Sequence, residues 1–366
     1  MTEKTYSARI NRLRKLLKAA KLPGMLVSNH TNVTYLTGFS GDASYLLVTA
    51  KELIIISDSR FTTQLAEECP GLKCEIRSDS GGTIAVVADV IRSLKVSNLG
   101  FESQAVTMAQ YEHWKSLFSS VELVAQSGLV EGLRAVKDST EIEKIRKAIE
   151  INERAFAIIR QQLRGNQTER EVAHNLENEM RAMGATGCAF PAIVAVGDRA
   201  ALPHATPGHQ RIEESSFVLV DWGTRNDGYV SDLTRMIIHG KPNAKFKKIY
   251  DVVLGAQLAA IRLIKPGVDC QVVDAAARSF IAKAGFGKYF GHGLGHGIGV
   301  QVHESPYFSP TRKGVLEEGM VVTVEPGIYL PEFGGVREDD VLVTRDGFEV
   351  LSQTPKSYEE SIITLI

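Results

Sequence analysis

The stretch FVLVDWGTRNDGYVSDLTR, residues 217–235, decides how the second half of this chain folds. It begins as an apolar strand pattern ending in Asp221, passes through a turn flanked by Gly223 and Gly228, and returns as a strand carrying Asp232. A carboxylate inside a buried strand costs several kcal/mol unless it is paired or bound to a metal. The stretch therefore predicts a hairpin whose two carboxylates share a ligand.

The same design recurs later in the chain. Residues 321–325, VVTVE, form a second apolar strand pattern ending in Glu325, and its return strand carries Glu338. Four converging carboxylates without a partner would repel one another and raise each other's pKa values. A cluster of cations removes this repulsion. Bridging carboxylates with one imidazole suit two divalent ions of Mn, Co, Fe or Zn, about 3.5–4 Å apart.

A glycine-rich segment with histidines lies between the two hairpins. It reads GHGLGHGIG over residues 291–299 and is followed by His303. A lone histidine is more often structural, but glycines on both sides let the backbone pass close to a ligand. We therefore expect ligand or catalytic roles for His292, His296 and His303.

Three common motifs are excluded by their spacing. The alternating glycines do not match the G-x-G-x-x-G of a dinucleotide-binding loop, and HESPY at 303–307 lacks the second histidine of a zincin helix. Its proline would also break such a helix. The chain has no G-x-S-x-G nucleophile elbow either, which argues against a serine hydrolase of that type.

The composition is that of an ordinary soluble globular protein, with 44% hydrophobic residues, 23% charged residues and a net charge of −1. This balance predicts no nucleic-acid partner and no membrane association. The N-terminus lacks the apolar core of a signal peptide. The four cysteines have neither metal-binding nor disulfide-framework spacing, which favours a reducing cytoplasm.

The length of 366 residues predicts two domains. In residues 1–128, short strand patterns alternate with helical ones, which indicates an α/β domain, and segments 32–41 and 58–61 are polar and turn-rich. The second domain, residues 129–366, opens with a long helical pattern over 137–163. Asp138 or Ser139 is expected to cap this helix.

The second domain is expected to contain two related halves, each a pair of helices with a carboxylate-bearing hairpin. One helix begins at Thr168 with Glu171 at capping-box spacing, and another begins in a similar style around residues 267–273. Such a duplication would place two pairs of acids around a pseudo-twofold axis, which is an efficient way to build a two-metal site.

The set Asp221, Asp232, His296, Glu325 and Glu338 resembles the five-ligand signature of the dinuclear metallopeptidases with the pita-bread fold. The wider resemblance is to their Xaa-Pro branch, aminopeptidase P and prolidase, and it covers nearly the entire chain. The motifs that carry it are NVTYLTGF at 32–39, DSRF at 58–61, LRAVK at 133–137, FPAIVA at 190–195, LPH at 202–204 and VHE at 302–304. It implies an α/β N-terminal domain followed by an α+β pita-bread domain with an internal pseudo-twofold.

The resemblance also implies the metal ligands. Asp221 would chelate one ion, and Asp232 and Glu338 would bridge two. His296 and Glu325 would complete the shell of one ion. The two divalent ions are expected to be manganese, with cobalt or zinc as alternatives.

The activity implied by the resemblance is hydrolysis of the bond between an N-terminal residue and proline. A metal-bridging hydroxide with a depressed pKa would attack the carbonyl. Glu325 would carry its proton, His204 and His303 would stabilise the oxyanion, and His292 would line the substrate pocket. The substrates would be small peptides with proline in second position, and the protein a homodimer. An Xaa-Pro aminopeptidase is expected, with a dipeptidase of prolidase type as the alternative.

One departure from the family pattern concerns the last ligand. The family reads Gly-Val-Arg-x-Glu-Asp, whereas this chain runs from Arg337 directly into Glu338 and Asp339. Aligning the downstream residues makes Glu338 the ligand, and aligning Arg337 makes Asp339 the ligand. A slip of one residue reverses the face of every side chain beyond it unless a bulge absorbs it. Glu338 is the expected ligand.

Two other classes of protein share this fold. A metal-free hydrolase of creatinase type would lack the ligand set that Asp221, Asp232, His296 and Glu325 represent. A catalytically weakened binding module would also be expected to have lost ligands, and the irregularity at 337–339 is the one feature that favours it.

Overall fold

The computed structural model describes residues 3–77, 81–330, 335–336 and 339–366. The chain forms two compact units, Met1–Arg134 and Ala135–Ile366. The predicted boundary at 128/129 coincides with the start of helix α6, Leu129–Ala135, and the units divide at the end of that helix. Within the described residues, no helix combines the length and the apolar character needed to cross a membrane.

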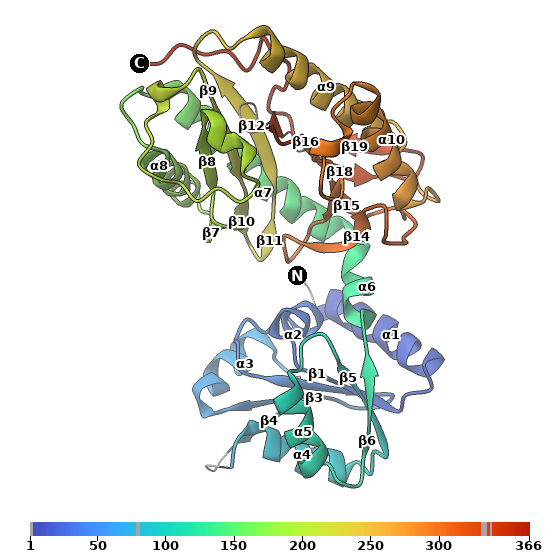
Figure 1. Cartoon of the computed structure of the whole chain (residues 1–366). Coiled ribbons are helices and arrows are strands. Elements are labelled where there is room, and N and C mark those ends of the chain that lie inside the picture. The colour runs from blue at the N-terminus through green and yellow to red at the C-terminus, as the bar shows by residue number, and fades with distance from the viewer. Residues whose placement is uncertain (1–2, 78–80, 331–334, 337–338) are drawn as a thin grey trace. The chain divides into compact units, whose positions relative to one another are not determined.

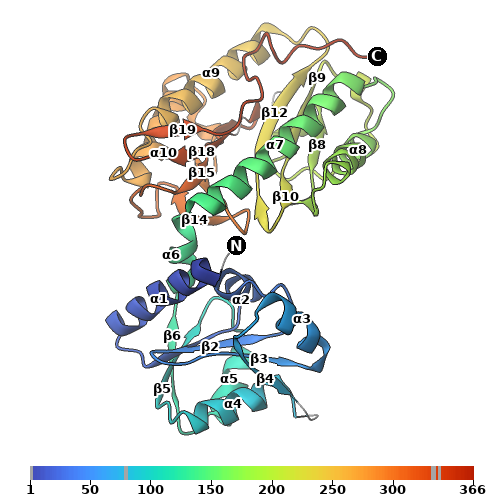
Figure 2. The ribbon, with the colours of Figure 1, turned by 180° about the vertical axis from the view of Figure 1, so that it is seen from behind.

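The first unit is an α/β domain around a six-stranded mixed sheet of order β4-β3-β2-β1-β5-β6. Helices α4 and α5 cover one face of this sheet and α1, α2 and α3 the other (Figures 1 and 2). The strands are β1 Gly24–Val27, β2 Tyr45–Thr49, β3 Leu53–Asp58, β4 Lys73–Arg77, β5 Asn98–Glu102 and β6 Glu122–Gln126. The helices are α1 Glu3–Ala19, α2 His30–Thr37, α3 Thr62–Glu68, α4 Thr83–Ser93 and α5 Met108–Leu117, with a 3₁₀ turn η1 at Ser59–Phe61.

Helix α2 corrects one prediction, since most of the segment expected to be turn-rich, 32–41, is helical up to Thr37. Asn29 caps this helix by accepting a hydrogen bond from the N–H of Thr31, and Gly38 ends it in the left-handed conformation with φ of 85°. The β-branched residues of the segment have low helix propensity, but burial of its apolar face outweighs that preference.

The first half of the second unit packs helices α7, Ser139–Gln162, and α8, Glu169–Ala182, beside a sheet of order β12-β9-β8 (Figures 1 and 2). The predicted caps are confirmed, because Asp138 with Glu141 and Thr168 with Glu171 form capping boxes. Its strands are β7 Gly187–Cys188, β8 Ile193–Val196, β9 Phe217–Trp222, β10 Thr224–Asn226, β11 Tyr229–Val230 and β12 Leu233–Ile238, with 3₁₀ turns η2 Gly197–Ala201 and η3 Ile212–Glu214.

The second half repeats this plan with helices α9, Ala244–Ile261, and α10, Cys270–Lys283, beside a sheet of order β14-β13-β15-β18-β19. Its strands are β13 Gly295–Gly297, β14 Glu304–Phe308, β15 Val321–Thr323, β16 Gly327–Ile328, β17 Gly335–Val336, β18 Asp340–Val343 and β19 Phe348–Val350, with a 3₁₀ turn η4 at Gly287–Tyr289. The β9–β12 hairpin contains the short β10–β11 pair, and β15–β18 likewise contains β16–β17. The predicted halves are therefore visible in the strand pairing.

Strand β9 separates two apolar cores. Phe217 and Leu219 belong to the core shared with α9, α10 and the second sheet, whereas Val218 and Val220 pack with α7 and α8. Because side chains alternate along a strand, Asp221 points to the same face as Phe217 and Leu219. The sheet thereby directs a carboxylate toward the space between the two halves.

Candidate active site and metal centre

One cavity of about 1040 Å³ in the second unit gathers the predicted site residues. Aromatic and apolar side chains, among them Phe190, Leu202, Tyr289 and Tyr307, form part of its wall. Every described residue predicted to bind metal or act in catalysis lines it, namely Asp221, Asp232, Glu325, His204, His292, His296 and His303. Residues more than a hundred positions apart in the chain thus meet in one place.

The first hairpin brings its two carboxylates onto one face. Asp221 is paired with Thr234 across the β9–β12 ladder, and the same register continues to the pair of Arg225 and Val230. Asp232 therefore stands two residues from the partner of Asp221, and diagonal neighbours of this kind lie within reach of one another. Gly223, opposite Asp232 in this register, is required because a Cβ there would lie 2.3 Å from the carbonyl oxygen of Ser231.

Asp221 carries a buried oxygen with no partner. Its Oδ1 makes no hydrogen bond to any described residue. Burial and the nearby charge of Glu325 raise the pKa of Asp221 to about 7, although the hydroxyl of Thr234 partly offsets this by hydrogen bonding. A desolvated carboxylate oxygen that faces a cavity and has no hydrogen-bond partner suits the role of a metal ligand.

The imidazole of His296 joins the carboxylates. Its Nε2 lies 3.2 Å from Oε1 of Glu325 and 3.8 Å from Oδ2 of Asp232. The hydroxyl of Thr323 accepts a hydrogen bond from the backbone N–H of His296 and donates one to Glu325, each 3.1 Å long. Sequence analysis missed Thr323, which sits two residues before Glu325 and fixes both groups.

The pKa values of this pair shift in opposite directions. Burial is the largest single influence and acts to lower the pKa of His296, but the hydrogen bond and charge of Glu325, together with backbone hydrogen bonds, raise it. Burial likewise acts to raise the pKa of Glu325, and the hydrogen bond to His296 lowers it. A divalent cation bound by these carboxylates would compete with a proton on His296, because a histidine must be deprotonated at the nitrogen that binds a metal.

The other three histidines surround this cluster. The ring of His303 stands edge-on to that of His296 with centroids 4.4 Å apart, and burial together with the charge of His296 lowers the pKa of His303. His204 is exposed at the cavity and acts electrostatically on His303. The Nε2 of His292 is 2.9 Å from the hydroxyl of Tyr329, a contact that the sequence did not reveal.

An ion pair on helix α10 anchors the chain around His292. Asp274 pairs with Arg278 at 2.9 Å and accepts a hydrogen bond from the N–H of Leu294. Arg278 in turn donates to the carbonyl oxygens of Phe290 and His292. The glycine-rich segment is therefore tied to α10 on both sides of His292.

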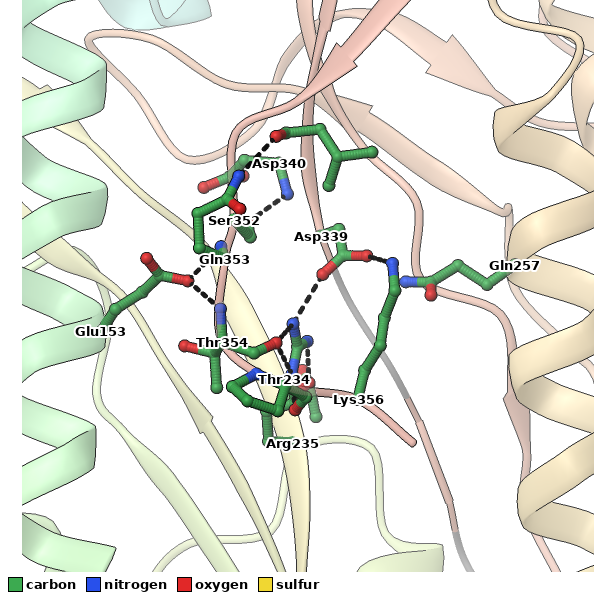
Figure 3. A network of polar contacts seen from close by, with 12 residues as sticks. Glu153, Thr234, Arg235, Gln257, Asp339, Asp340, Ser352, Gln353, Thr354 and Lys356 are labelled. Carbon is green, nitrogen blue, oxygen red and sulfur yellow. Dashed lines mark hydrogen bonds and ion pairs between the residues drawn. The ribbon is translucent and has the colours of Figure 1, made fainter. Parts of the chain in front are cut away.

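Asp339, the alternative for the last ligand, is engaged elsewhere (Figure 3). Its Oδ1 accepts from Nη2 of Arg235 at 2.7 Å, and its Oδ2 contacts the ammonium of Lys356. Arg235 is 2% exposed and also donates to the carbonyl oxygen of Thr354. Both carboxylate oxygens of Asp339 are thus occupied by cations. Glu338 lies outside the described residues.

The donor set fits divalent ions. Three carboxylates and one imidazole face a shared cavity, and one of their oxygens has no partner in the described part of the chain. Among the residues that the structure describes, no three of these donors already surround one point at metal-binding distance. The fifth predicted ligand, Glu338, is outside that set.

Comparison with known proteins finds family matches over nearly the whole chain. Residues 143–345 match Metallopeptidase family M24, and residues 9–136 match the Creatinase/Prolidase N-terminal domain. The chain is 35% identical to the Xaa-Pro dipeptidase of Pyrococcus horikoshii, covering 95% of this chain and 97% of that protein.

Two solved structures show the same arrangement. An Xaa-Pro dipeptidase from Bacillus anthracis superposes with a TM-score of 0.92 at 40% identity, covering 96% of this chain and 99% of that one. An X-Pro aminopeptidase from Thermotoga maritima MSB8 superposes with a TM-score of 0.87 at 36% identity, covering 97% of this chain and 100% of that one.

Proposed function

The chain belongs to metallopeptidase family M24 and has its pita-bread fold, and from this premise we propose that it is an Xaa-Pro peptidase. It hydrolyses the bond between an N-terminal residue and proline in small peptides. The observation that carries the proposal is the single cavity that brings three carboxylates and four histidines together. Relatives named Xaa-Pro dipeptidase and X-Pro aminopeptidase over nearly the full length support the substrate class.

In this proposal Asp221, Asp232, His296, Glu325 and Glu338 hold two divalent ions, with manganese as the physiological metal. When bound, such ions supply Lewis acidity and lower the pKa of a water molecule that serves as nucleophile. The unpaired Oδ1 of Asp221 supports a role in that shell.

The surroundings of Asp339 support Glu338 as the fifth ligand. Arg235 contacts one carboxylate oxygen of Asp339 and Lys356 contacts the other. Asp339 is therefore held as a structural carboxylate. Glu338, the ligand expected from the sequence, is kept in this proposal.

The remaining groups take roles that follow from their surroundings. Glu325, within 3.2 Å of His296, carries the proton between the nucleophile and the leaving amine. His303 and His204 face the cavity and donate hydrogen bonds to the developing oxyanion. His292, held by Tyr329, lines the pocket for the substrate.

A specific observation favours the dipeptidase as the second candidate. Two cations, Lys288 and Arg312, line the cavity together with the acids and histidines. The guanidinium of Arg312 lies 4.0 Å from the ring centre of Tyr307, which is paired with His296 across the β13–β14 ladder. A cation near the ligand His296 suits the free carboxylate of an Xaa-Pro dipeptide.

This preference has its own test. Arg312→Ala is expected to lower kcat/KM for an Xaa-Pro dipeptide by about tenfold or more and to leave the corresponding Xaa-Pro amide unaffected. Lys313→Ala, an exposed neighbour outside the cavity lining, is the control. Equal loss on the acid and the amide would remove this support for the dipeptidase.

The proposal also includes a homodimer and a cytoplasmic location, which sedimentation and cell fractionation would check. The main experiment compares hydrolysis of an Xaa-Pro dipeptide and an Xaa-Pro-Yaa tripeptide by chelator-stripped protein with and without Mn²⁺. Metal-dependent release of the first residue is expected. No turnover, with less than one metal bound per chain, would favour the binding module, and turnover without metal would favour a hydrolase of creatinase type.

A further inference from the structure

A buried ion pair lies next to the cavity without lining it. The Nζ of Lys137 is 3.5 Å from Oε2 of Glu304, and the two side chains are only 1% and 3% exposed. Removing two charges from water costs several kcal/mol per ion, so replacing such a pair by apolar residues is often neutral or stabilising. A gain in stability therefore does not explain this buried pair. A role in fixing the positions of neighbouring residues would explain it.

Both partners are anchored by further contacts. The backbone N–H of Lys137 donates to the carbonyl oxygen of Gly319 at 3.0 Å, and its ammonium donates to that of Ala135 at 3.1 Å. Oε1 of Glu304 accepts a hydrogen bond of 2.9 Å from the N–H of Gln301. The pair thus connects the start of the second unit to the 299–304 loop, whose last residue, Glu304, begins strand β14.

Gly299 shows how tightly the pair is enclosed. A Cβ at this position would lie 2.7 Å from Oε2 of Glu304 and 3.0 Å from Cε of Lys137. A larger residue here would force the ends of both side chains to shift, so glycine leaves the pair undisturbed. The last glycine of the GHGLGHGIG segment is therefore explained by the ion pair.

The loop held by this pair carries His303. The ring of His303 stands edge-on to that of His296, and this contact depends on the backbone of the loop because the loop carries His303. Its immediate neighbour is Glu304, which is fixed by Lys137 and by Gln301. Displacing Glu304 would displace His303 relative to His296.

We propose that Lys137 and Glu304 are positioning residues, whose ion pair fixes the 299–304 loop and thereby holds His303 toward the cavity. This inference rests on the proposed peptidase function for its kinetic consequence. The geometric consequence is independent of that function.

The kinetic test is a double-mutant cycle between Glu304→Gln and His303→Ala on the metal-loaded protein. Glu304→Gln keeps the size of the side chain and an acceptor for Gln301 but removes the charge. We expect kcat for an Xaa-Pro peptide to fall by a factor on the order of 10 to 100, with KM and metal content unchanged. In the His303→Ala background the same change is expected to have less than about a twofold effect.

Glu349→Gln is the control, because it breaks the exposed ion pair between Arg146 and Glu349 on the surface of the same unit. If Glu304→Gln does not fold, Lys137→Met combined with Glu304→Gln removes both charges, and the same loss of kcat is expected. Equal losses in the wild-type and His303→Ala backgrounds would overturn the proposal, since a purely structural pair acts independently of His303.

A spectroscopic readout separates this inference from the proposed function. In ring-labelled protein, the His303 signal, identified by its loss in His303→Ala, is expected to shift or broaden in Glu304→Gln and not in Glu349→Gln. An unchanged His303 signal would overturn the inference even in an active enzyme. A wild type without peptidase activity would overturn the proposed function alone, and the signal would still decide the positioning role.

Discussion

Asp339→Asn distinguishes a structural carboxylate from a metal ligand. Asp339 is fully buried and Arg235 is 2% exposed, so the substitution removes a carboxylate charge that faces a buried guanidinium. Removing one partner of a buried ion pair costs about 3–5 kcal/mol. Arg235 keeps its hydrogen bonds to the carbonyl oxygens of Thr234 and Thr354, which places the expected loss near the lower end, about 3 kcal/mol.

This loss can be converted into a shift in the melting temperature. A domain of 150–250 residues loses about 2–4 °C per kcal/mol, so the unit Ala135–Ile366 should melt about 6–12 °C lower. The assay is thermal unfolding of chelator-treated wild type and Asp339→Asn, together with Mn²⁺ titration of both. Unchanged metal stoichiometry is expected.

Glu338→Gln is the matched comparison. It is expected to reduce metal stoichiometry or affinity and to leave the unfolding of the metal-free protein nearly unchanged. The opposite pattern, in which Asp339→Asn loses a metal without losing stability, would refute both the ion-pair argument and the choice of Glu338 over Asp339 as the ligand.

Three further predictions follow from the site. The pKa of Asp221 is raised to about 7 from an ordinary 3.8. Between these two pH values the metal-free folded state therefore binds more protons than the unfolded state. The contribution of Asp221 to the free energy of unfolding falls as the pH rises through this window. Denaturant midpoints of wild type and Asp221→Asn with chelator should therefore diverge toward pH 7 in favour of the variant, and parallel curves would contradict the shift. Arg278→Ala removes the hydrogen bond to the carbonyl oxygen of His292 and should lower kcat/KM about tenfold in steady-state kinetics. Metal analysis should show an unchanged metal content. Loss of metal would contradict a role confined to the pocket. Gly295→Ala places a Cβ 2.2 Å from a backbone carbonyl oxygen of β15 and should lower the melting temperature. Gly291→Ala places a Cβ with no atom within 4 Å and should leave the melting temperature unchanged. Equal melting temperatures of the two variants would contradict this description of the packing.

The local part of the fold could be predicted because its signals are local. Thr168 and Glu171 are three residues apart, and the capping box that they form depends on little else. The hairpin of Asp221 and Asp232 follows from strand alternation and the turn between them. Helix α2 was wrongly expected to be a turn-rich segment, since burial against the rest of the unit overrides the low propensity of its β-branched residues.

The sequence by itself determined the types of donor and the pairing of Asp221 with Asp232 in the first hairpin, because a period of two fixes which side chains share a face. Only the tertiary structure decided which charges neutralise which. Asp339 contacts Arg235, which lies 104 positions earlier in the chain, and Glu304 pairs with Lys137 at the beginning of the second unit. Such pairs depend on distances created by packing, and no spacing along the chain encodes them. The physical reason is that charge interactions act through space, while sequence patterns report only neighbours along the backbone.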